Sequence, residues 1–365
     1  MKKIIFFSKD LSIGGMEKAL VALINSLCNN YEITLVLEEK KGILLKSVDP
    51  KIKIKEYKLS TSKNIILRKI HNYFKRFFWR FNNAKKYDFS CNYATYSVIG
   101  SRLSQIASNN SIYYVHSDYY NVFKKDINKI KSFFKEHHLE KFRKIVFVAN
   151  ESKNNFLKIY PEYKEKCEVI NNLIDYNKIK KQSHEKIDFK IDKNKINFIF
   201  IGRLDNSSKN IELLLKSFNL AYQKNKNIKL YILGNGPYLN SILDFINKTN
   251  NQKNIVVIKE TTNPYAYLQK CDVLILTSNY EGFPVVYLEA LVLNKKIMTT
   301  VLTSDDTINI KDYAIKLEPK EEKIAEKMAS ISKKTINYNI DFSKINKEKI
   351  NKTIELIEVK EKCKK

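Results

Sequence analysis

Two carboxylates frame a predicted turn into a helix in residues 279–291 (Asn-Tyr-Glu-Gly-Phe-Pro-Val-Val-Tyr-Leu-Glu-Ala-Leu). Glu281 follows the apolar run Val273–Thr277, which has the character of a strand, and Gly282-Phe283-Pro284 then lead into a helical segment. Glu289 lies more than one turn inside that helix. At a rise of about 1.5 Å per residue, its carboxylate lies roughly 7–8 Å along the axis from the helix start.

The start of this helix is a predicted anion site. The first N–H groups of a helix have no partner within it, and they stand at the positive end of the helix dipole. Carboxylates on both sides of an anion site suit a nucleoside diphosphate sugar, which has hydroxyls at both ends and a diphosphate between them. The spacing alone favours two solvated glutamates beside an ordinary strand-to-helix turn, so the neighbouring segments decide the interpretation.

Three further segments share the order strand, glycine turn, helix. One ends in Gly202-Arg203 and is followed by Lys209, so that two cations six residues apart could close on a diphosphate from one side. Another breaks at Gly234-Asn235-Gly236, and the third, near the N-terminus, breaks at Gly14-Gly15. Each turn alone is typical of an ordinary connection, and either cation alone is typical of a protein surface.

Taken in order, these motifs resemble those of the retaining GT-B glycosyltransferases, in particular the bacterial family 4 of nucleotide-sugar hexosyltransferases. The resemblance covers most of the chain and is densest from Asn197 to Thr300. Two segments depart from the family pattern and leave the sugar specificity open: Asn294-Lys295-Lys296 stands where a Gly and a Pro are usual, and Thr303–Asp306 lacks the small and glycine residues that the family usually has there. The matching motifs are Gly14-Gly15-Met16-Glu17, Val115–Asp118, Asn172–Asp175, Gly202-Arg203-Leu204 with Lys209-Asn210, Gly234-Asn235-Gly236-Pro237, Asn263-Pro264, and Glu281-Gly282-Phe283-Pro284 with Glu289-Ala290-Leu291.

The resemblance implies a reaction without a metal or a cofactor, in which a nucleotide diphosphate sugar is the donor substrate. Charge on the departing phosphate is then stabilised by Arg203, Lys209 and the helix start after Glu281. Glu281 is also expected at the sugar ring, and Glu289 at the ribose hydroxyls. His116 is expected near the reacting sugar as a hydrogen-bonding or charge-stabilising group, or else as a buried histidine at a strand end. The other expected donor-binding residues are Gly14, Gly15, Gly202, Asn235, Gly282, Phe283 and Pro284.

Length and hydrophobic pattern predict two α/β domains. A chain of 365 residues suits two domains of ordinary size, each with a full core. Short apolar runs alternate with helical runs, which argues for two mainly parallel, doubly wound sheets. The expected strands are Lys3–Phe7, Ile33–Leu37, Ile52–Tyr57, Phe89–Tyr93, Ile112–His116, Lys144–Ala149, Glu168–Asn171, Ile196–Ile201, Ile228–Leu233, Ile255–Ile258, Val273–Thr277, Lys296–Thr300 and Ala314–Leu317.

The resemblance implies the GT-B architecture, in which two Rossmann-like domains face each other across a cleft. We expect an N-terminal, acceptor-binding domain at residues 1–178 and a polar, lysine-rich linker at 179–195. A C-terminal, nucleotide-sugar-binding domain is expected at 196–340. The last segment, 341–365, is expected to be a helix that packs back on the first domain.

The formal net charge of +27 has two sources. Part reflects a general excess of lysine, and no nucleic-acid-binding module accompanies it, so nucleic acid is not an expected partner. The other part is local, since residues 57–87 contain no acidic residue and repeat apolar residues at helical spacing. This pattern is typical of a basic amphipathic helix at an anionic bilayer interface. The alternative is a core-facing helix with a solvated basic side. The expected membrane-contact residues are Phe74, Arg76, Phe77, Phe78, Trp79 and Arg80.

These patterns also indicate a compartment. No run of 18 apolar residues occurs, and the N-terminal apolar run is expected to be a buried strand rather than an export signal. The cysteines have no paired spacing, which favours free thiols in a reducing cytosol. We therefore expect a cytoplasmic protein that is peripheral on the inner face of the plasma membrane. The cysteines are Cys28, Cys91, Cys167, Cys271 and Cys363.

The predicted function is transfer of a hexose or N-acetylhexosamine from a nucleotide diphosphate sugar to a lipid-linked saccharide, with retention of configuration, in bacterial surface polysaccharide synthesis. UDP-linked donors are expected before GDP-linked ones. A dehydrogenase is disfavoured because Gly234-Asn235-Gly236 lacks the third glycine of a dinucleotide fingerprint. Two alternatives stay open: a GT-B-fold nucleotide-sugar epimerase or hydrolase, and a glycan-binding protein that has lost catalysis.

Overall fold

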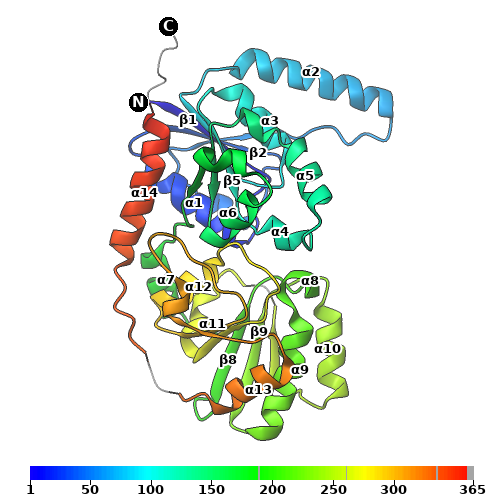
Figure 1. The fold of residues 1–365 in the computed structure, drawn as a ribbon, viewed down its shortest axis with the longest axis vertical. Coiled ribbons are helices and arrows are strands. Elements are labelled where there is room, and N and C mark those ends of the chain that lie inside the picture. Colours follow the sequence, from blue (N-terminus) through cyan, green and yellow to red (C-terminus); the bar gives the residue numbers. More distant parts are fainter. Residues whose placement is uncertain (188–189, 260, 334–335, 360–365) are drawn as a thin grey trace. The chain divides into compact units, whose positions relative to one another are not determined.

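The computed structural model describes residues 1–187, 190–259, 261–333 and 336–359 (Figure 1). The chain divides into two compact units. The first is formed by Met1–Leu173 together with the C-terminal segment that starts at Ser343, and the second by Ile174–Phe342. Cys363 lies outside the described residues, whereas the other four cysteines are buried free thiols.

The first unit is built on a parallel sheet with the strand order β3-β2-β1-β4-β5-β6-β7. In β1 and β2 a single exposed residue is followed by five buried ones, the near-continuous apolar pattern of parallel strands covered on both faces. Its strands are β1 (Lys3–Ser8), β2 (Glu32–Leu37), β3 (Lys53–Glu56), β4 (Phe89–Asn92), β5 (Ser111–Val115), β6 (Lys144–Phe147) and β7 (Cys167–Val169). Its helices are α1 (Gly15–Leu27), α2 (Ile65–Asn83), α3 (Val98–Ala107), α4 (Tyr119–Val122), α5 (Ile127–Glu136), α6 (Asn150–Leu157) and α14 (Phe342–Glu358).

The second unit is built on a parallel sheet with the strand order β10-β9-β8-β11-β12-β13. Its strands are β8 (Ile196–Ile201), β9 (Ile228–Leu233), β10 (Ile255–Ile258), β11 (Val273–Leu276), β12 (Lys296–Thr299) and β13 (Ala314–Lys316). Its helices are α7 (Tyr176–Ser183), α8 (Asn206–Lys209), α9 (Ile211–Lys224), α10 (Leu239–Lys248), α11 (Tyr265–Lys270), α12 (Val285–Val292) and α13 (Glu321–Ser330).

Both sheets are doubly wound, as the sequence predicts. The strand order reverses between β1 and β4 in the first unit and between β8 and β11 in the second. In such sheets ligands bind at the carboxyl ends of the strands, where the order reverses. Every strand expected from the sequence is present, with ends within two residues of those expected. The predicted α/β fold class is therefore confirmed.

The segment expected to be a linker, 179–195, differs from the expectation in its first part. It begins inside α7, which packs against α11 and α12. Ile179 is buried there, and Asn263 Nδ2 donates a hydrogen bond of 2.9 Å to the Gln182 carbonyl. These contacts make α7 part of the second unit. Its polar, lysine-rich composition does not reveal that one face of this helix is buried.

Helix α14 ends against the first unit. The Arg143 guanidinium donates a hydrogen bond of 2.7 Å to the Leu356 carbonyl, and its Nε donates one of 2.6 Å to Asn110 Oδ1. Asn110 Nδ2 in turn donates to the same carbonyl at 3.1 Å. A guanidinium at the carboxyl end of a helix satisfies carbonyls that lack an intrahelical partner and complements the helix dipole.

Helix α2 differs from the expectation at one residue. Trp79 is only 9% exposed, and its ring packs edge-on against Tyr57 at 5.2 Å and Phe7 at 6.0 Å between centroids. The prediction that Trp79 contacts a membrane is therefore wrong. It faces the opposite side of the helix from the phenylalanines, because one residue along an α-helix turns the side chain by about 100°.

The contacts of Arg143 predict a stability change. Arg143→Ala is expected to lower the free energy of unfolding by about 1.5–3 kcal/mol, because a charged hydrogen-bond donor is lost from the end of α14. Thermal and urea unfolding followed by circular dichroism measures this. The control is Lys131→Ala, which changes the same charge on the exposed side of α5. Equal stability of both variants would contradict the proposed anchoring of α14.

Candidate functional site

Three turns meet at the carboxyl edge of the second sheet, after β8, β9 and β11. The first two pack backbone against backbone: a Cβ on Gly234 would lie 1.9 Å from the Gly202 carbonyl oxygen, and a Cβ on Gly236 would lie 2.3 Å from that of Leu204. The Leu204 N–H also donates to the Asn235 carbonyl at 2.9 Å. Because any side chain at Gly234 or Gly236 would collide with backbone, this part of the edge requires glycine.

The turn after β8 is shaped by Asp205. Its carboxylate accepts hydrogen bonds from the backbone N–H of Ser208 at 2.7 Å and from the hydroxyls of Ser207 and Ser208. Burial raises the pKa of Asp205, but these hydrogen bonds outweigh it and the pKa lies below its usual value. One helical turn, α8, follows and ends at Asn210, which adopts the left-handed conformation (φ 48°, ψ 54°) before α9 begins.

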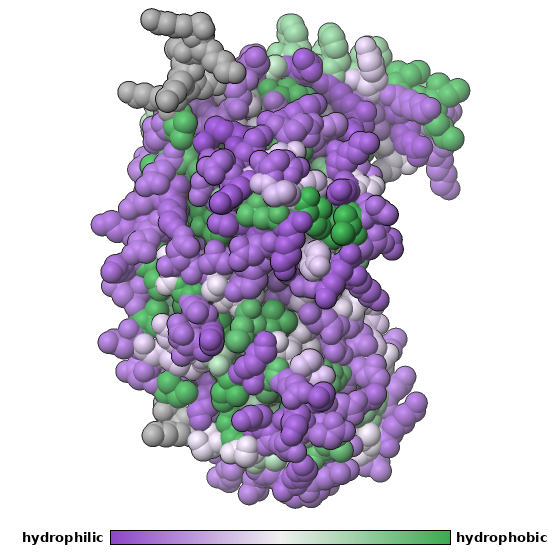
Figure 2. Space-filling view, viewed as in Figure 1, coloured by the Kyte–Doolittle hydropathy of each residue, from purple (hydrophilic) through white to green (hydrophobic). Residues whose placement is uncertain are grey.

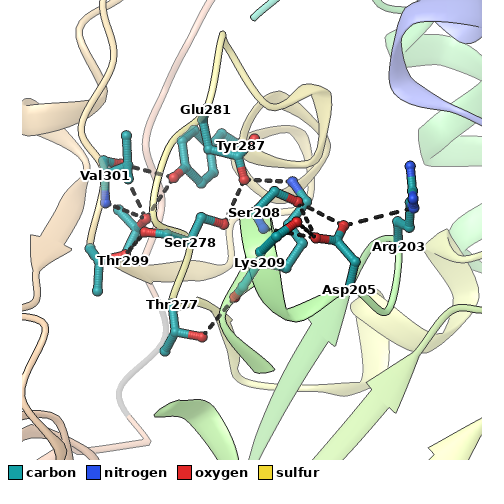
Figure 3. A network of polar contacts seen from close by, with 12 residues as sticks. Arg203, Asp205, Ser208, Lys209, Thr277, Ser278, Glu281, Tyr287, Thr299 and Val301 are labelled. Carbon is teal, nitrogen blue, oxygen red and sulfur yellow. Dashed lines mark hydrogen bonds and ion pairs between the residues drawn. The ribbon is translucent and has the colours of Figure 1, made fainter. Parts of the chain in front are cut away.

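This turn brings Lys209 to Glu281, as Figure 3 shows. Lys209 Nζ lies 2.5 Å from Glu281 Oε1, and the two side chains are only 19% and 10% exposed. Ser278 donates a second hydrogen bond of 2.6 Å to the same oxygen. The predicted cation and the predicted carboxylate are thus in direct contact, although they stand 72 residues apart in the sequence.

Backbone contacts hold the two turns together. The Asn279 N–H donates to the Ser208 carbonyl at 2.8 Å, and its side-chain amide donates to the Ser207 carbonyl at 3.0 Å. The Thr277 hydroxyl donates to the Asn210 carbonyl at 3.0 Å (Figure 3 shows Thr277 beside Lys209). The sequence analysis did not single out Ser278 or Asn279. Their signal is the polar run directly after the buried strand β11.

Arg203 does not join this contact. Its side chain is 73% exposed, and its Nε lies 3.8 Å from Asp205 Oδ2. In Figure 3 it stands on the other side of Asp205 from Lys209 and Glu281. Such an exposed, long ion pair holds a side chain weakly. The two cations therefore do not converge in this structure. Lys209 lies at the Glu281 turn, whereas Arg203 points elsewhere.

Helix α12 starts beside Glu281. Pro284 is its N-cap, and the Pro284 side chain makes no capping hydrogen bond. Phe283 is buried with its ring edge-on to Tyr287. Tyr287 donates to the Val301 carbonyl at 2.9 Å and contacts the Thr299 hydroxyl at 2.6 Å (Figure 3). Tyr287 thus ties the first turn of α12 to Thr299 and Val301, and the N-cap residue Pro284 has no side-chain acceptor to offer the first N–H groups.

Glu289 lies at the fifth residue of α12 and is only 2% exposed. The turn between Glu281 and this residue contains Gly282. A carboxylate at this depth offers little surface to a ligand. Its expected contact with ribose hydroxyls stays a prediction.

In the first unit, α1 starts at Gly15 with Gly14 as its N-cap. The Glu17 carboxylate folds back over this start, since a Cβ on Gly14 would lie 2.1 Å from Glu17 Oε2. Burial raises the pKa of Glu17 to about 7, with a smaller rise from Asp10, against the lowering effect of its own backbone N–H. Glu17 is therefore only partly ionised near neutral pH.

His116 follows β5 in the first unit. Its ring lies 4.5 Å from that of Tyr93 and stacks on Tyr114 at 5.5 Å between centroids. Burial lowers the pKa of His116 to about 3, although the Tyr93 backbone opposes this. Neither ring nitrogen has a hydrogen-bond partner among the described residues. A neutral imidazole can exchange hydrogen bonds, and the expected place of His116 near a reacting sugar stays a prediction.

Comparison with known proteins bears on the second unit. Residues 181–349 match the model of the family Glycosyl transferases group 1, and this range contains all of the candidate residues of that unit. An uncharacterized glycosyltransferase of Methanocaldococcus jannaschii is 31% identical over 159 residues, 43% of this chain and 39% of that protein.

A relative from Campylobacter jejuni is named N-acetylgalactosamine-N,N'-diacetylbacillosaminyl-diphospho-undecaprenol 4-alpha-N-acetylgalactosaminyltransferase. It is 35% identical over 138 residues, which are 37% of this chain and 35% of that protein. The match thus spans less than two fifths of the length of each of these two curated relatives.

Among solved structures, Anabaena HepE in complex with UDP and glucose superposes with a TM-score of 0.70 at 14% identity, over 97% of this chain and 100% of that chain. At this identity the similarity establishes the fold alone. The chain therefore has the GT-B fold, two Rossmann-like domains each built on a parallel sheet, and its second unit resembles the glycosyl transferases of group 1.

Proposed function

We propose that the protein is a glycosyltransferase that moves a hexose or N-acetylhexosamine from a UDP-linked donor to a lipid-linked saccharide, with retention of configuration. The observation that carries this proposal is the Lys209–Glu281 contact beside the uncapped start of α12. It lies within the region that matches a glycosyltransferase family model. We place the reaction in bacterial surface polysaccharide synthesis.

The named relatives support the finer parts of the proposal. The Campylobacter jejuni relative is named as an N-acetylgalactosaminyltransferase with a diphospho-undecaprenol-linked substrate. The Anabaena structure is described as a complex with UDP and glucose. These names favour a UDP-sugar as donor and a lipid-linked saccharide as acceptor for this chain.

In the proposed reaction the main task of the protein is to stabilise the charge of the departing diphosphate. Lys209 is 19% exposed, so a phosphate oxygen can reach it and compete with Glu281 for the ammonium group. The N–H groups at the start of α12 offer further donors to the same anion. Glu281, released from Lys209 in part, can then accept a hydrogen bond from a sugar hydroxyl.

The other candidate residues keep smaller parts in the proposal. Arg203 is the second cation and has to turn from Asp205 toward the diphosphate. Glu289 binds the ribose hydroxyls. His116, as a neutral imidazole, serves as a hydrogen-bonding group for a sugar. The remaining donor contacts are assigned to backbone groups at Gly14, Gly15, Gly202, Asn235, Gly282, Phe283 and Pro284.

We also propose that the protein works on the cytoplasmic face of the plasma membrane, held by α2. Within the described chain, no helix has both the length and the hydropathy of a membrane-spanning segment. Figure 2 shows hydrophobic residues gathered along α2. Phe74, Phe77 and Phe78 are each more than half exposed. Arg76 and Arg80, beside them, are exposed cations that suit anionic lipid head groups.

The leaving-group role of Lys209 is tested by substitution. Lys209→Ala is expected to lower kcat/KM by about 10²–10³-fold, which corresponds to about 2.7–4 kcal/mol of transition-state stabilisation. The measurement is UDP release from a panel of UDP-sugars with a polyprenyl-linked saccharide as acceptor. The control is Lys216→Ala, which breaks a surface pair with Glu212 (2.8 Å) in the same unit. Near-normal transfer by Lys209→Ala would remove the proposed role.

The membrane contact is tested by charge. The double variant Arg76→Gln/Arg80→Gln is expected to bind anionic vesicles about 30-fold more weakly at low salt, since each of the two cations near the surface contributes about 1 kcal/mol. Vesicle sedimentation measures the binding. The control Lys248→Gln/Lys253→Gln removes the same charge from exposed positions of the second unit. If both double variants bind alike, the net charge rather than α2 attracts the membrane.

A further inference from the structure

Helix α2 turns its apolar side away from the unit that carries it. Its inner side is formed by Asn72, Trp79 and Asn83, which repeat at a spacing of seven and four residues. Asn72 exchanges two hydrogen bonds with the backbone of Ser60, at 2.8 and 3.2 Å. Asn83 is buried and bonds within the helix, to the Trp79 carbonyl at 3.0 Å. Asn72 and Trp79 thus attach the helix, through Ser60 and through the Tyr57 and Phe7 rings, while the exposed apolar residues take no part in the attachment.

The outer side is a broad apolar face. At about 100° per residue, its members cover more than a third of the helix circumference on the side opposite Asn72 and Trp79. An amphipathic helix of a globular domain buries such a face, so this face lacks its partner. The exposed apolar residues are Ile66 (69%), Leu67 (59%), Ile70 (49%), Tyr73 (65%), Phe74 (52%), Phe77 (53%), Phe78 (56%) and Phe81 (74%).

One edge of this face borders a groove. The groove runs between α2 and the segment 60–62, with a volume of about 700 Å³. Pockets that hold small molecules have volumes of roughly 300–1,000 Å³. Phe74 and Phe78, stacked at 6.5 Å between centroids, form its apolar wall. It is lined by Ser60, Ser62, Leu67, Ile70, His71, Phe74, Lys75 and Phe78.

The charges around the groove specify the ligand further. Residues 57–87 contain no acidic residue. Lys75 is engaged, since it donates to the Lys58 carbonyl at 2.6 Å and lies over the Tyr57 ring. The remaining cations of the helix are exposed, and none forms an ion pair with a carboxylate in the part of the chain described here. At about 100° per residue, Arg68 lies on the side of the helix that borders the groove, whereas Lys69, Arg76 and Arg80 lie on its other side.

We propose that the groove between α2 and residues 60–62 binds one hydrocarbon chain of an anionic membrane lipid, with the lipid head group at Arg68. This inference deepens the proposed function, because it rests on work at the membrane and assigns α2 a lipid site rather than only a charged surface. A chain in the groove contacts the apolar wall along its length, and the missing acidic residues remove the repulsion that an anionic head group would meet.

Helix α2 offers a matched pair of variants. Phe74→Ser/Phe78→Ser removes the wall of the groove, whereas Phe77→Ser/Phe81→Ser removes two phenyl rings of at least equal exposure outside it. All four side chains are more than half exposed, so neither variant disturbs the core. Circular dichroism verifies that both are folded. The probe is cis-parinaric acid, an anionic single hydrocarbon chain, kept below its aggregation concentration and followed by fluorescence.

The wild-type protein and the Phe77→Ser/Phe81→Ser variant are expected to bind the probe with the same saturable affinity. The groove variant is expected to bind about tenfold more weakly, because half of the lining apolar residues are lost. The proposal is overturned if the wild type shows no saturable binding, or if both variants weaken it equally. It is also overturned if lipid-free protein forms a dimer that both variants dissociate, since a second copy would then cover the face. The assay needs neither donor nor acceptor, so it can fail while sugar transfer succeeds.

Discussion

The contact between Lys209 and Glu281 is the interaction on which the candidate site depends. It closes two βα turns of the second sheet on each other, with Ser278 supplying a second hydrogen bond to the same carboxylate oxygen. A largely buried ion pair is costly to form and costly to break, because removal of one partner leaves a charge without compensation. An anionic ligand that shares the ammonium group therefore acts on a site that is already organised, and Glu281 becomes available to a hydroxyl at the same moment.

The backbone around this contact is as constrained as the side chains. The turns after β8 and β9 approach so closely that a methyl group on Gly234 would collide with the Gly202 carbonyl oxygen. Asp205 fixes the short helix α8, and the left-handed Asn210 then separates it from α9. This break directs Lys209 toward β11 instead of along the helix. The site is thus a property of the sheet edge, where parallel strands place their carboxyl ends together.

Much of this arrangement could be predicted from the sequence, for a physical reason. Parallel strands covered on both faces are continuous apolar runs, so every strand was identifiable, and the glycine turns marked where each strand ends. Side-chain direction was not predictable in the same way. The helical spacing in residues 65–83 is equally compatible with an inward or an outward apolar face, and only the contacts of Asn72 and Trp79 distinguish the two. Likewise, the spacing of Arg203 and Lys209 in the sequence does not show that the Arg203 side chain is exposed and lies beside Asp205.

The two units differ in the chemistry that they can offer to a diphosphate sugar. The second unit holds the cations, whereas the candidates of the first are uncharged or nearly so: the backbone at Gly14 and Gly15, and a neutral His116. Glu17 would oppose an anion at the start of α1 if it were ionised, but its raised pKa makes the protonated form accessible near neutral pH. A carboxyl group that can give up its charge lets the α1 start accept a phosphate without loss of the glycine turn. In the proposed function the second unit therefore supplies the charge that binds the diphosphate, and the candidates of the first unit offer hydrogen bonds.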